Sequence, residues 1–196
     1  MKSTGQVKTD RTIALVGLMG AGKSAIGRRL GIRLGLGFTD ADTEIERSAG
    51  KTISNIFEFE GEKGFRRRER RIIKDLLDRP AHVLATGGGA FIDVKTRSVI
   101  RQKALSVWLK ADLKTLHRRV VRRANRPLLL EGNPKEILAA LIDERYPIYA
   151  LADIVIDSVD SSHEEMIDKV VNGIISYDRL HGLTDGSRVD VKESHR

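Results

Sequence analysis

Two hydrophobic patterns alternate along this sequence: short runs of consecutive apolar residues, and longer segments in which apolar residues recur every three or four positions. The runs are typical of buried strands in a parallel sheet, and the spaced segments are typical of helices with one buried face. We predict strands at 12–18, 37–40, 82–86, 104–109 and 153–157. We predict helices at 23–34, 43–60, 65–77, 112–123, 135–149 and 163–177, with one more between the third and fourth strands. Five strands separated by helices indicate an α/β fold with a mostly parallel sheet.

Length and composition fit one domain, which we expect at 12–179 between tails at 1–11 and 180–196 that lack periodicity. The chain has 196 residues, and 40% of them are hydrophobic, which is enough for one core of ordinary size. No residue is cysteine, which excludes a disulfide framework and fits a reducing compartment. The longest apolar run, 137–142, is too short to span a membrane, and the polar N-terminus lacks a secretory signal. We therefore expect a soluble cytoplasmic protein.

The net charge of +8 comes from two short arginine clusters, at 66–71 (RRRERR) and at 118–126. Outside these clusters the charges nearly cancel. Compact clusters of this kind suit a small polyanion at least as well as a nucleic-acid backbone. Aromatic residues, on which bases would stack, make up 5% of the chain. The charge therefore favours a small anionic ligand, and we expect no nucleic-acid partner.

The segment GLMGAGKS at 17–24 matches the pattern G-x-x-x-x-G-K-[ST], directly after a predicted buried strand and at the start of a predicted helix. Glycines let several backbone N–H groups point at one anion, and the helix N-terminus adds positive charge. In this pattern Lys23 contacts the β- and γ-phosphates, and the Ser24 hydroxyl is a ligand of Mg²⁺. We predict a nucleoside triphosphate site here, the alternative being a glycine-rich turn with an incidental lysine.

Asp40 and Asp42 follow the second predicted strand, at the edge where ligands of open parallel sheets bind. Because Mg²⁺ on a nucleotide needs few protein oxygens, one aspartate near the metal and one near a phosphoryl acceptor is a consistent division. The alternative is helix capping, either by Asp42 or by Thr43 with Glu46 at capping-box spacing. Beside a phosphate loop, we favour a functional role for at least one aspartate.

A glycine triplet, 87–89, closes the third predicted strand, where a Walker B aspartate is commonly found. The lack of an acid there strengthens the case for Asp40 as the metal-side residue. Three glycines allow a substrate to lie against bare backbone, although a flexible turn is the alternative.

The arginines differ in context. Most of those at 66–71 are expected on a solvated helix face, with Glu69 pairing locally. Pro127 disfavours a helical Arg126 and indicates a loop, where an arginine suits a phosphoryl-transfer lid; a helix-terminal arginine is the alternative. Arg145 precedes Tyr146-Pro147, where we expect the helix to end or kink, and its role stays open.

Taken together, several segments resemble the shikimate kinase family. They are GLMGAGKS at 17–24, FTDADTEIE at 38–46, FEFEGEKGFRRRE at 57–69, TGGGAF at 86–91, RPLL at 126–129 and RYPIYALAD at 145–153. Each later motif is weak alone, but the ordered set, over about 12–176, is specific. The resemblance implies a P-loop NTPase fold like that of nucleoside monophosphate kinases, with a substrate-binding region at about 41–78 and a lid at about 119–133. The lid segment before RPLL is short and rich in arginine.

The implied activity is transfer of the γ-phosphate of ATP to the 3-hydroxyl of shikimate, with Mg²⁺, on the way to chorismate and the aromatic amino acids. The implied ATP-binding residues share the phosphate loop and the lid: Gly20, Ala21, Gly22, Lys23, Ser24, Ala25, Arg119 and Arg126. Ser24 and Asp40 match the metal-side residues, while Arg119 matches by spacing alone.

For the acceptor, the resemblance implies five residues: Asp42, Arg66, Gly88, Gly89 and Arg145. Arg66 and Arg145 match the pair that binds the shikimate carboxylate, and Asp42 matches the residue that binds the acceptor hydroxyls. Lys23, Asp42 and Arg126 are the implied catalytic residues. We expect a monomer.

Three other functions compete with this one. A small-molecule kinase of the same build, such as a gluconate-type sugar-acid kinase, would share the phosphate loop. A nucleic-acid-associated ATPase would use the arginine clusters, and a non-catalytic module would only bind nucleotide.

Overall fold

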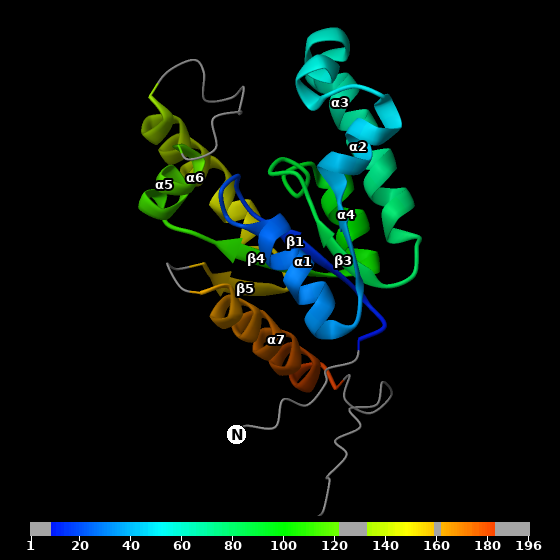
Figure 1. Cartoon of the computed structure of the whole chain (residues 1–196), viewed down its shortest axis with the longest axis vertical. Helices are drawn as coiled ribbons and strands as arrows, with labels where there is room; N and C mark the ends of the chain where they lie inside the picture. Colours follow the sequence, from blue (N-terminus) through cyan, green and yellow to red (C-terminus); the bar gives the residue numbers. More distant parts are fainter. Residues whose placement is uncertain (1–8, 122–132, 159–161, 183–196) are drawn as a thin grey trace, which may run out of the picture.

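A five-stranded parallel sheet, with strand order β2-β3-β1-β4-β5, forms the centre of the molecule (Figure 1). The structure is a computed structural model that describes residues 9–121, 133–158 and 162–182. Its strands are β1 (Thr12–Val16), β2 (Gly37–Asp40), β3 (His82–Ala85), β4 (Ala104–Lys110) and β5 (Ile154–Asp157). All residues of β1 and β3 are buried, as expected for strands covered on both faces. The predicted α/β fold is confirmed.

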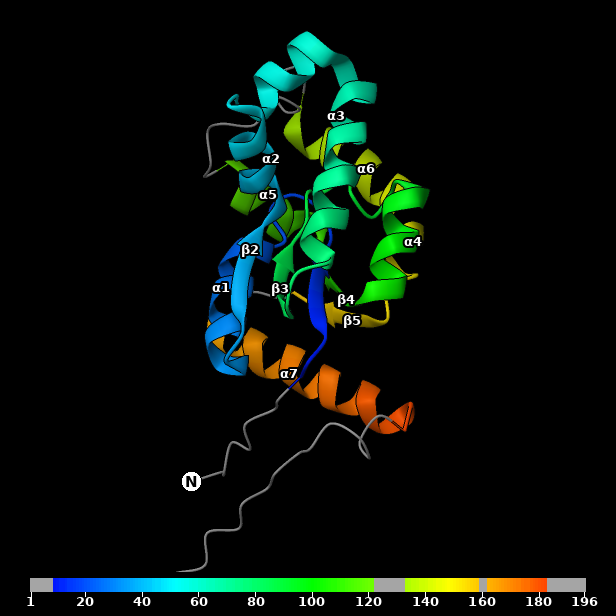
Figure 2. The ribbon, with the colours of Figure 1, turned by 90° about the vertical axis from the view of Figure 1, so that its right-hand side faces the viewer.

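Helices cover both faces of the sheet. The helices are α1 (Lys23–Leu34), α2 (Ala41–Ala49), α3 (Ile53–Leu77), α4 (Val94–Lys103), α5 (Leu113–Val121), α6 (Pro134–Tyr149) and α7 (His163–Leu180). Helices α1 and α7 contact each other on one side, and α4 stands on the opposite side (Figure 2). The strand order requires this, because the crossover from β1 to β2 through α1 and the crossover from β3 to β4 through α4 run in opposite directions along the sheet, and right-handed crossovers of opposite direction place their helices on opposite faces. Among the described residues, none of the helices is both long and apolar enough to cross a membrane.

Helices α2 and α3 carry the part of the chain in which the substrate-binding region is expected. They pack against each other and rise away from the sheet at the top of Figure 1. A small cluster of buried Ile45, Ile56 and Phe65 holds them together, separate from the main core around the sheet. The helix predicted at 43–60 is thus two helices. The second continues through a non-helical Gly61 into the helix predicted from residue 65.

Among the predicted element ends, those of β1 and α7 were wrong, whereas the end of α6 at residue 149 is confirmed and only the break expected within it is absent. Strand β1 ends at Val16 rather than at residue 18, because Gly17 has a φ of +133° and turns the chain out of the sheet. Helix α6 neither ends nor kinks at Tyr146-Pro147 but runs to Tyr149. Pro147 lies in the last turn, where it removes a single N–H donor, and Tyr149 anchors that turn in the core. Helix α7 extends to Leu180, just past the expected domain end, before Gly182 takes a left-handed conformation.

Candidate active site

The phosphate loop follows β1 and turns into α1, as predicted. Gly17, Gly20 and Gly22 all have positive φ values, of +133°, +82° and +97°. These are conformations that other residues rarely adopt. At Gly20 a side chain would also collide with Val120 of α5, since an added Cβ would lie 2.9 Å from that side chain. The glycines therefore set both the path of the loop and its packing.

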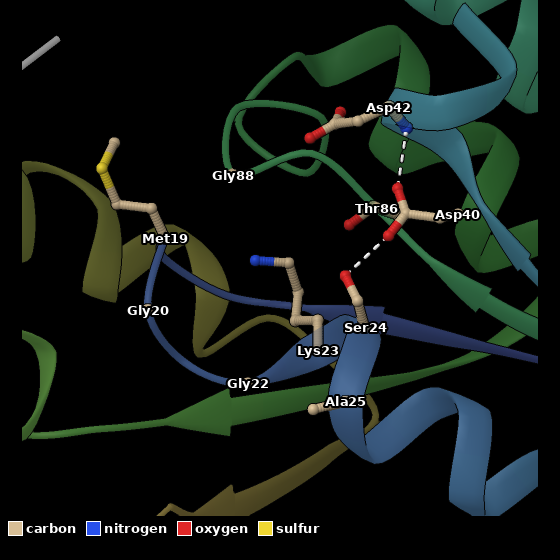
Figure 3. Close-up of a pocket in the computed structure, with 10 residues that line it drawn as sticks. All are labelled: Met19, Gly20, Gly22, Lys23, Ser24, Ala25, Asp40, Asp42, Thr86 and Gly88. Carbon is tan, nitrogen blue, oxygen red and sulfur yellow. Dashed lines mark hydrogen bonds between the residues drawn. The ribbon is translucent and has the colours of Figure 1, made fainter. Parts of the chain in front are cut away.

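A hollow opens beside this loop, where the carboxyl ends of β1, β2 and β3 meet (Figure 3). It is lined by Met19, Gly20, Gly22, Lys23, Ser24, Ala25, Asp40, Asp42, Thr86 and Gly88. Eight of these residues were predicted site residues; Met19 and Thr86 were not. Thr86 donates a hydrogen bond from its hydroxyl to the Leu15 carbonyl (2.9 Å), which ties the end of β3 to β1.

Lys23 brings the one ammonium group among these ten residues. Its Nζ donates hydrogen bonds to the carbonyl oxygens of Gly17 (2.7 Å) and Leu18 (3.0 Å). Its side chain extends over the inside of the loop, on the side of the hollow that faces Asp42 (Figure 3). The positive charge therefore lies at the centre of the turn in which a phosphate group would bind.

Asp40 connects the starts of two helices. Its Oδ2 accepts a hydrogen bond from the Ser24 hydroxyl (2.6 Å), and its Oδ1 accepts one from the backbone N–H of Asp42 (3.1 Å). Asp40 is thus the N-cap of α2. An aspartate does cap this helix, as the alternative supposed, but it is Asp40 rather than Asp42. The reason is that α2 begins earlier than predicted, so that Asp42 lies inside its first turn. Glu46 instead accepts a hydrogen bond from the N–H of Ile53 (3.0 Å).

The glycine triplet lies against three charged side chains. A Cβ on Gly87 would lie 2.7 Å from Oδ1 of Asp42 and 3.0 Å from Oε1 of Glu69. A Cβ on Gly89 would overlap the guanidinium of Arg66. Only glycine allows these side chains to approach the turn so closely. The fold thus brings Asp42, Arg66 and the triplet together, from three separate parts of the sequence.

Arg66 and Glu69 form an ion pair of 2.7 Å on the inner face of α3. The Glu69 side chain is 1% exposed and that of Arg66 is 23% exposed. Burial raises the pKa of Glu69 and outweighs the opposing effect of Arg66, with the nearby Asp42 adding to the rise. For Arg66, burial lowers the pKa, but the Glu69 and Glu62 carboxylates together more than compensate, so the net change is upward. Arg66 therefore remains a cation beside the triplet.

The arginines at 66–71 are less solvated than expected. Arg68 pairs with Glu60 (2.7 Å), and Arg70 pairs with Asp93 (2.8 Å), at the end of the loop that contains the triplet. Arg67 and Arg71 are exposed, as predicted. The prediction of a solvated face was wrong for the others because α3 packs against α4 and folds back over its own kink.

Arg145 approaches the same glycine triplet from α6. Its side chain is 17% exposed, with Nε 3.5 Å from a carboxylate oxygen of Glu144. It also interacts with the hydroxyl of Tyr149, which in turn donates a hydrogen bond to the carbonyl of Gly88. Neither Arg66 nor Arg145 lines the hollow beside the phosphate loop. Arg66 reaches the turn that closes it at Gly89, and Arg145 is connected to that turn through Tyr149.

Arg119, on α5, lies at the outer side of the phosphate loop. Its guanidinium is 3.4 Å from the carbonyl oxygens of Gly20 and Ala21 and donates a hydrogen bond to the Ser158 hydroxyl (3.1 Å). Ala21 is buried beneath it. Arg126 and most of the predicted lid at 119–133 lie outside the described residues.

The donor set at Ser24 and Asp40 fits Mg²⁺. A hydroxyl and a carboxylate, 2.6 Å apart, are the hard oxygen ligands that this ion prefers. Within the described ranges, no three His, Cys, Asp or Glu side chains meet as a metal cage. Two protein oxygens suit an ion that takes its other ligands from phosphate and water.

Comparisons with known proteins agree on one family. Residues 19–175 match the family model described as Shikimate kinase. The chain is 54% identical over 170 residues to a shikimate kinase of Paramagnetospirillum magneticum, which covers 87% of each protein. A solved shikimate kinase from Acinetobacter baumannii, in complex with shikimate, superposes with a TM-score of 0.82 and 41% identity, over 86% of this chain and 94% of that one. This chain belongs to the shikimate kinase family.

The alternative sugar-acid kinase is less similar. A gluconokinase from Sinorhizobium meliloti superposes with a TM-score of 0.58 at 16% identity, over 91% of this chain and 99% of that one. That likeness shows a shared P-loop kinase fold and nothing about the acceptor. Shikimate kinase relatives cover most of this chain at about half identity, so the comparisons support the main prediction over this alternative.

Sequence reasoning missed three residues that this member of the shikimate kinase family places around the glycine triplet and the phosphate loop. They are Glu69, Tyr149 and Ser158. Glu69 had a readable signal, since it stands four residues from both Phe65 and Ile73 and therefore on the apolar face of α3. Tyr149 also had a signal in the sequence, because it follows Arg145 by four residues and therefore lies on the same face of the predicted helix. Ser158 had none, because a lone serine after a strand is common.

Proposed function

We propose that this enzyme transfers the γ-phosphate of ATP to the 3-hydroxyl of shikimate and releases shikimate 3-phosphate and ADP. Membership of the shikimate kinase family carries the proposal. The geometry supports it, because a phosphate loop with a lysine lies next to a turn that both a carboxylate and a guanidinium approach. An alcohol that also carries a carboxylate is the kind of acceptor such a site would bind. We place the reaction in the cytoplasm, where ATP is abundant.

On the donor side, we assign charge stabilisation to Lys23, which would exchange the carbonyls of Gly17 and Leu18 for phosphate oxygens. Ser24 and Asp40 are the residues that would hold Mg²⁺, which supplies positive charge to the phosphates when bound. Backbone N–H groups of residues 20–25 would surround the phosphates. Arg119 and Arg126 remain predicted contacts to ATP.

On the acceptor side, we assign the carboxylate of shikimate to Arg66 and Arg145, and its hydroxyls to Asp42 and the backbone of Gly88 and Gly89. The 3-hydroxyl would give its proton to the Asp42 carboxylate as its oxygen attacks the γ-phosphorus. Support comes from the contact of Asp42 with Gly87 and of Arg66 with Gly89. Catalysis then rests on position and electrostatics rather than on a covalent intermediate.

The decisive experiment is a coupled ADP-release assay with ATP and Mg²⁺. We expect rapid release with shikimate and only background release without an acceptor or with gluconate. Lys23→Ala should abolish the shikimate-dependent rate. Release that gluconate drives and shikimate does not would overturn the acceptor assignment.

A further inference from the structure

The backbone carbonyl of Gly88, in the middle of the glycine triplet, accepts a hydrogen bond from a side chain of helix α6. The Gly87 carbonyl accepts a hydrogen bond from the N–H of Ala90 (3.2 Å), and the Gly89 carbonyl accepts one from Ile92 (3.1 Å). Both bonds lie within the loop. The Gly88 carbonyl instead accepts a hydrogen bond from the hydroxyl of Tyr149, in the last turn of α6. The central peptide of the turn is thus fixed from outside the loop.

Tyr149 is itself immobilised. Its side chain is 0% exposed, and its ring packs between Phe91, with centroids 6.5 Å apart, and Trp108, at 5.8 Å. Burial raises the pKa of Tyr149 well above its ordinary value, against the opposing influence of Arg145, so the phenol keeps its proton near neutral pH. A fixed ring and a retained proton make a donor of constant direction.

Fixing this carbonyl also fixes the next N–H group. The described chain contains no cis peptide bond, and in a planar trans peptide the carbonyl of one residue and the N–H of the next point in opposite directions. With the Gly88 oxygen turned to Tyr149, the N–H of Gly89 points away from the core. Gly89 is the residue against which Arg66 lies.

The same turn of helix holds a second site residue. Arg145 precedes Tyr149 by four positions, so the two side chains lie on one face of α6, where they interact. One helix end therefore supports both an arginine and the backbone of the glycine turn.

We infer that Tyr149 is a positioning residue for shikimate: its hydroxyl holds the Gly88–Gly89 peptide in the orientation that binds the acceptor and keeps that peptide in register with Arg145. This inference rests on the proposed function. The competing explanation is that Tyr149 only fills the aromatic core, in which case its hydroxyl does not affect shikimate.

Helix α6 offers a matched control. Tyr146 also donates a hydrogen bond from its hydroxyl to a backbone carbonyl, that of Ala111, and its ring also packs on Trp108, with centroids 4.9 Å apart. Tyr149→Phe and Tyr146→Phe each remove one oxygen atom and the part-buried hydrogen bond that it donates to a backbone carbonyl. They differ in whether that oxygen reaches the glycine turn and Arg145.

The test is steady-state kinetics of both variants, with folding checked by thermal unfolding. For Tyr149→Phe we expect the KM for shikimate to rise about tenfold and the KM for ATP to change less than twofold, as losing one hydrogen bond to a part-buried carbonyl implies. For Tyr146→Phe we expect both constants within twofold of the parent, at a comparable loss of stability. Equal shifts of the shikimate KM in the two variants would overturn the inference, as would equal effects on both substrates of Tyr149→Phe.

A measurement on the unmodified enzyme covers the case in which Tyr149→Phe does not fold. We expect the amide of Gly89 to be rigid before shikimate is added, with an NMR order parameter of about 0.85, and to stay so afterwards. An order parameter below about 0.6 in the free enzyme would refute a preset peptide. If the parent enzyme does not phosphorylate shikimate, the proposed function fails first, which separates the two outcomes.

Discussion

Arg66 and Glu69 form one ion pair, but the Arg66 side chain is partly exposed and the Glu69 side chain is buried. The Oε2 of Glu69 pairs with Arg66, while its Oε1 is buried beside Gly87 and has no hydrogen-bond partner among the described residues. A buried carboxylate of this kind depends on its cation, since removing one partner leaves an uncompensated charge. Arg66 therefore compensates the charge of Glu69, in addition to the role toward the acceptor that we propose for it.

We predict that Arg66→Ala weakens shikimate binding by ~2–5 kcal/mol, which is about 30-fold or more in KM, with little change in the KM for ATP. The physical reason is the loss of the guanidinium that we assign to the acceptor carboxylate. Arg67→Ala is the control, because Arg67 is adjacent but exposed. Steady-state kinetics on both variants measures the change in KM for shikimate and the change in KM for ATP. Equal changes for the two substrates would contradict the assignment.

We predict a distinct pH dependence for Glu69→Gln. The folded-state pKa of Glu69 is raised by burial above its ordinary value near 4.5, so the folded state keeps a proton that the unfolded state releases. The contribution of Glu69 to stability is therefore fully present below about pH 4.5 and is lost as pH rises through the folded-state pKa. The free energy of unfolding of the parent minus that of Glu69→Gln should fall with pH in this window. Urea titrations at several pH values measure it, and a flat or rising difference would refute the raised pKa.

At the scale of elements, α3 is two helical segments joined at one glycine. Gly61 has a φ of +64° and a ψ of +179°, a conformation essentially confined to glycine. The change of direction brings the start of α3 back toward α2, where Ile56 joins Ile45 and Phe65. The apolar spacing predicted both helical segments but not the bend between them, because one glycine in a helical pattern carries no directional information.

We predict that Gly61→Ala destabilises the protein by about 1–3 kcal/mol through backbone strain alone. A Cβ at Gly61 would meet no atom of residues 9–121, 133–158 or 162–182 within 4 Å, so we expect no steric contribution from them. Gly50→Ala is the matched control: it is equally open, but its left-handed φ of +62° and ψ of +21° cost an alanine only about 1–2 kcal/mol. Chemical denaturation of both variants gives the comparison. A stabilised Gly61→Ala would mean that α3 can straighten without loss.

For the whole molecule, periodicity and local motifs predicted the sheet, most helices and the phosphate loop. This worked because each depends on neighbouring residues: the buried strands read as apolar runs, and Gly17–Ser24 is a contiguous pattern. Contacts between distant segments were not readable in the same way. The approach of Glu69 to Gly87, and of Tyr149 to Gly88, depends on how α3 and α6 pack, and packing is a property of the fold rather than of any single segment.

The ion pairs of the arginine cluster at 66–71 argue against a nucleic-acid partner at that cluster. Among the five arginines at 66–71, Arg66, Arg68 and Arg70 are held by Glu69, Glu60 and Asp93. These pairs reduce the positive field that a phosphate backbone would meet.

We therefore predict that single-stranded DNA does not stimulate ATP turnover, even at low salt, where such binding is strongest. The ADP-release assay with and without DNA measures this. Stimulation that disappears steeply as salt is added would instead favour the ATPase alternative.

The Asp40 carboxylate connects the phosphate-loop side of the candidate site to the side that carries Asp42, so a movement of one side affects the other. Because one oxygen secures the first turn of α1 and the other secures the first turn of α2, a displacement on the nucleotide side is transmitted to Asp42 through a single residue. In the reaction that we propose, donor and acceptor are thereby kept in a common alignment. Loosening that residue would misalign the reactants even where each one still binds.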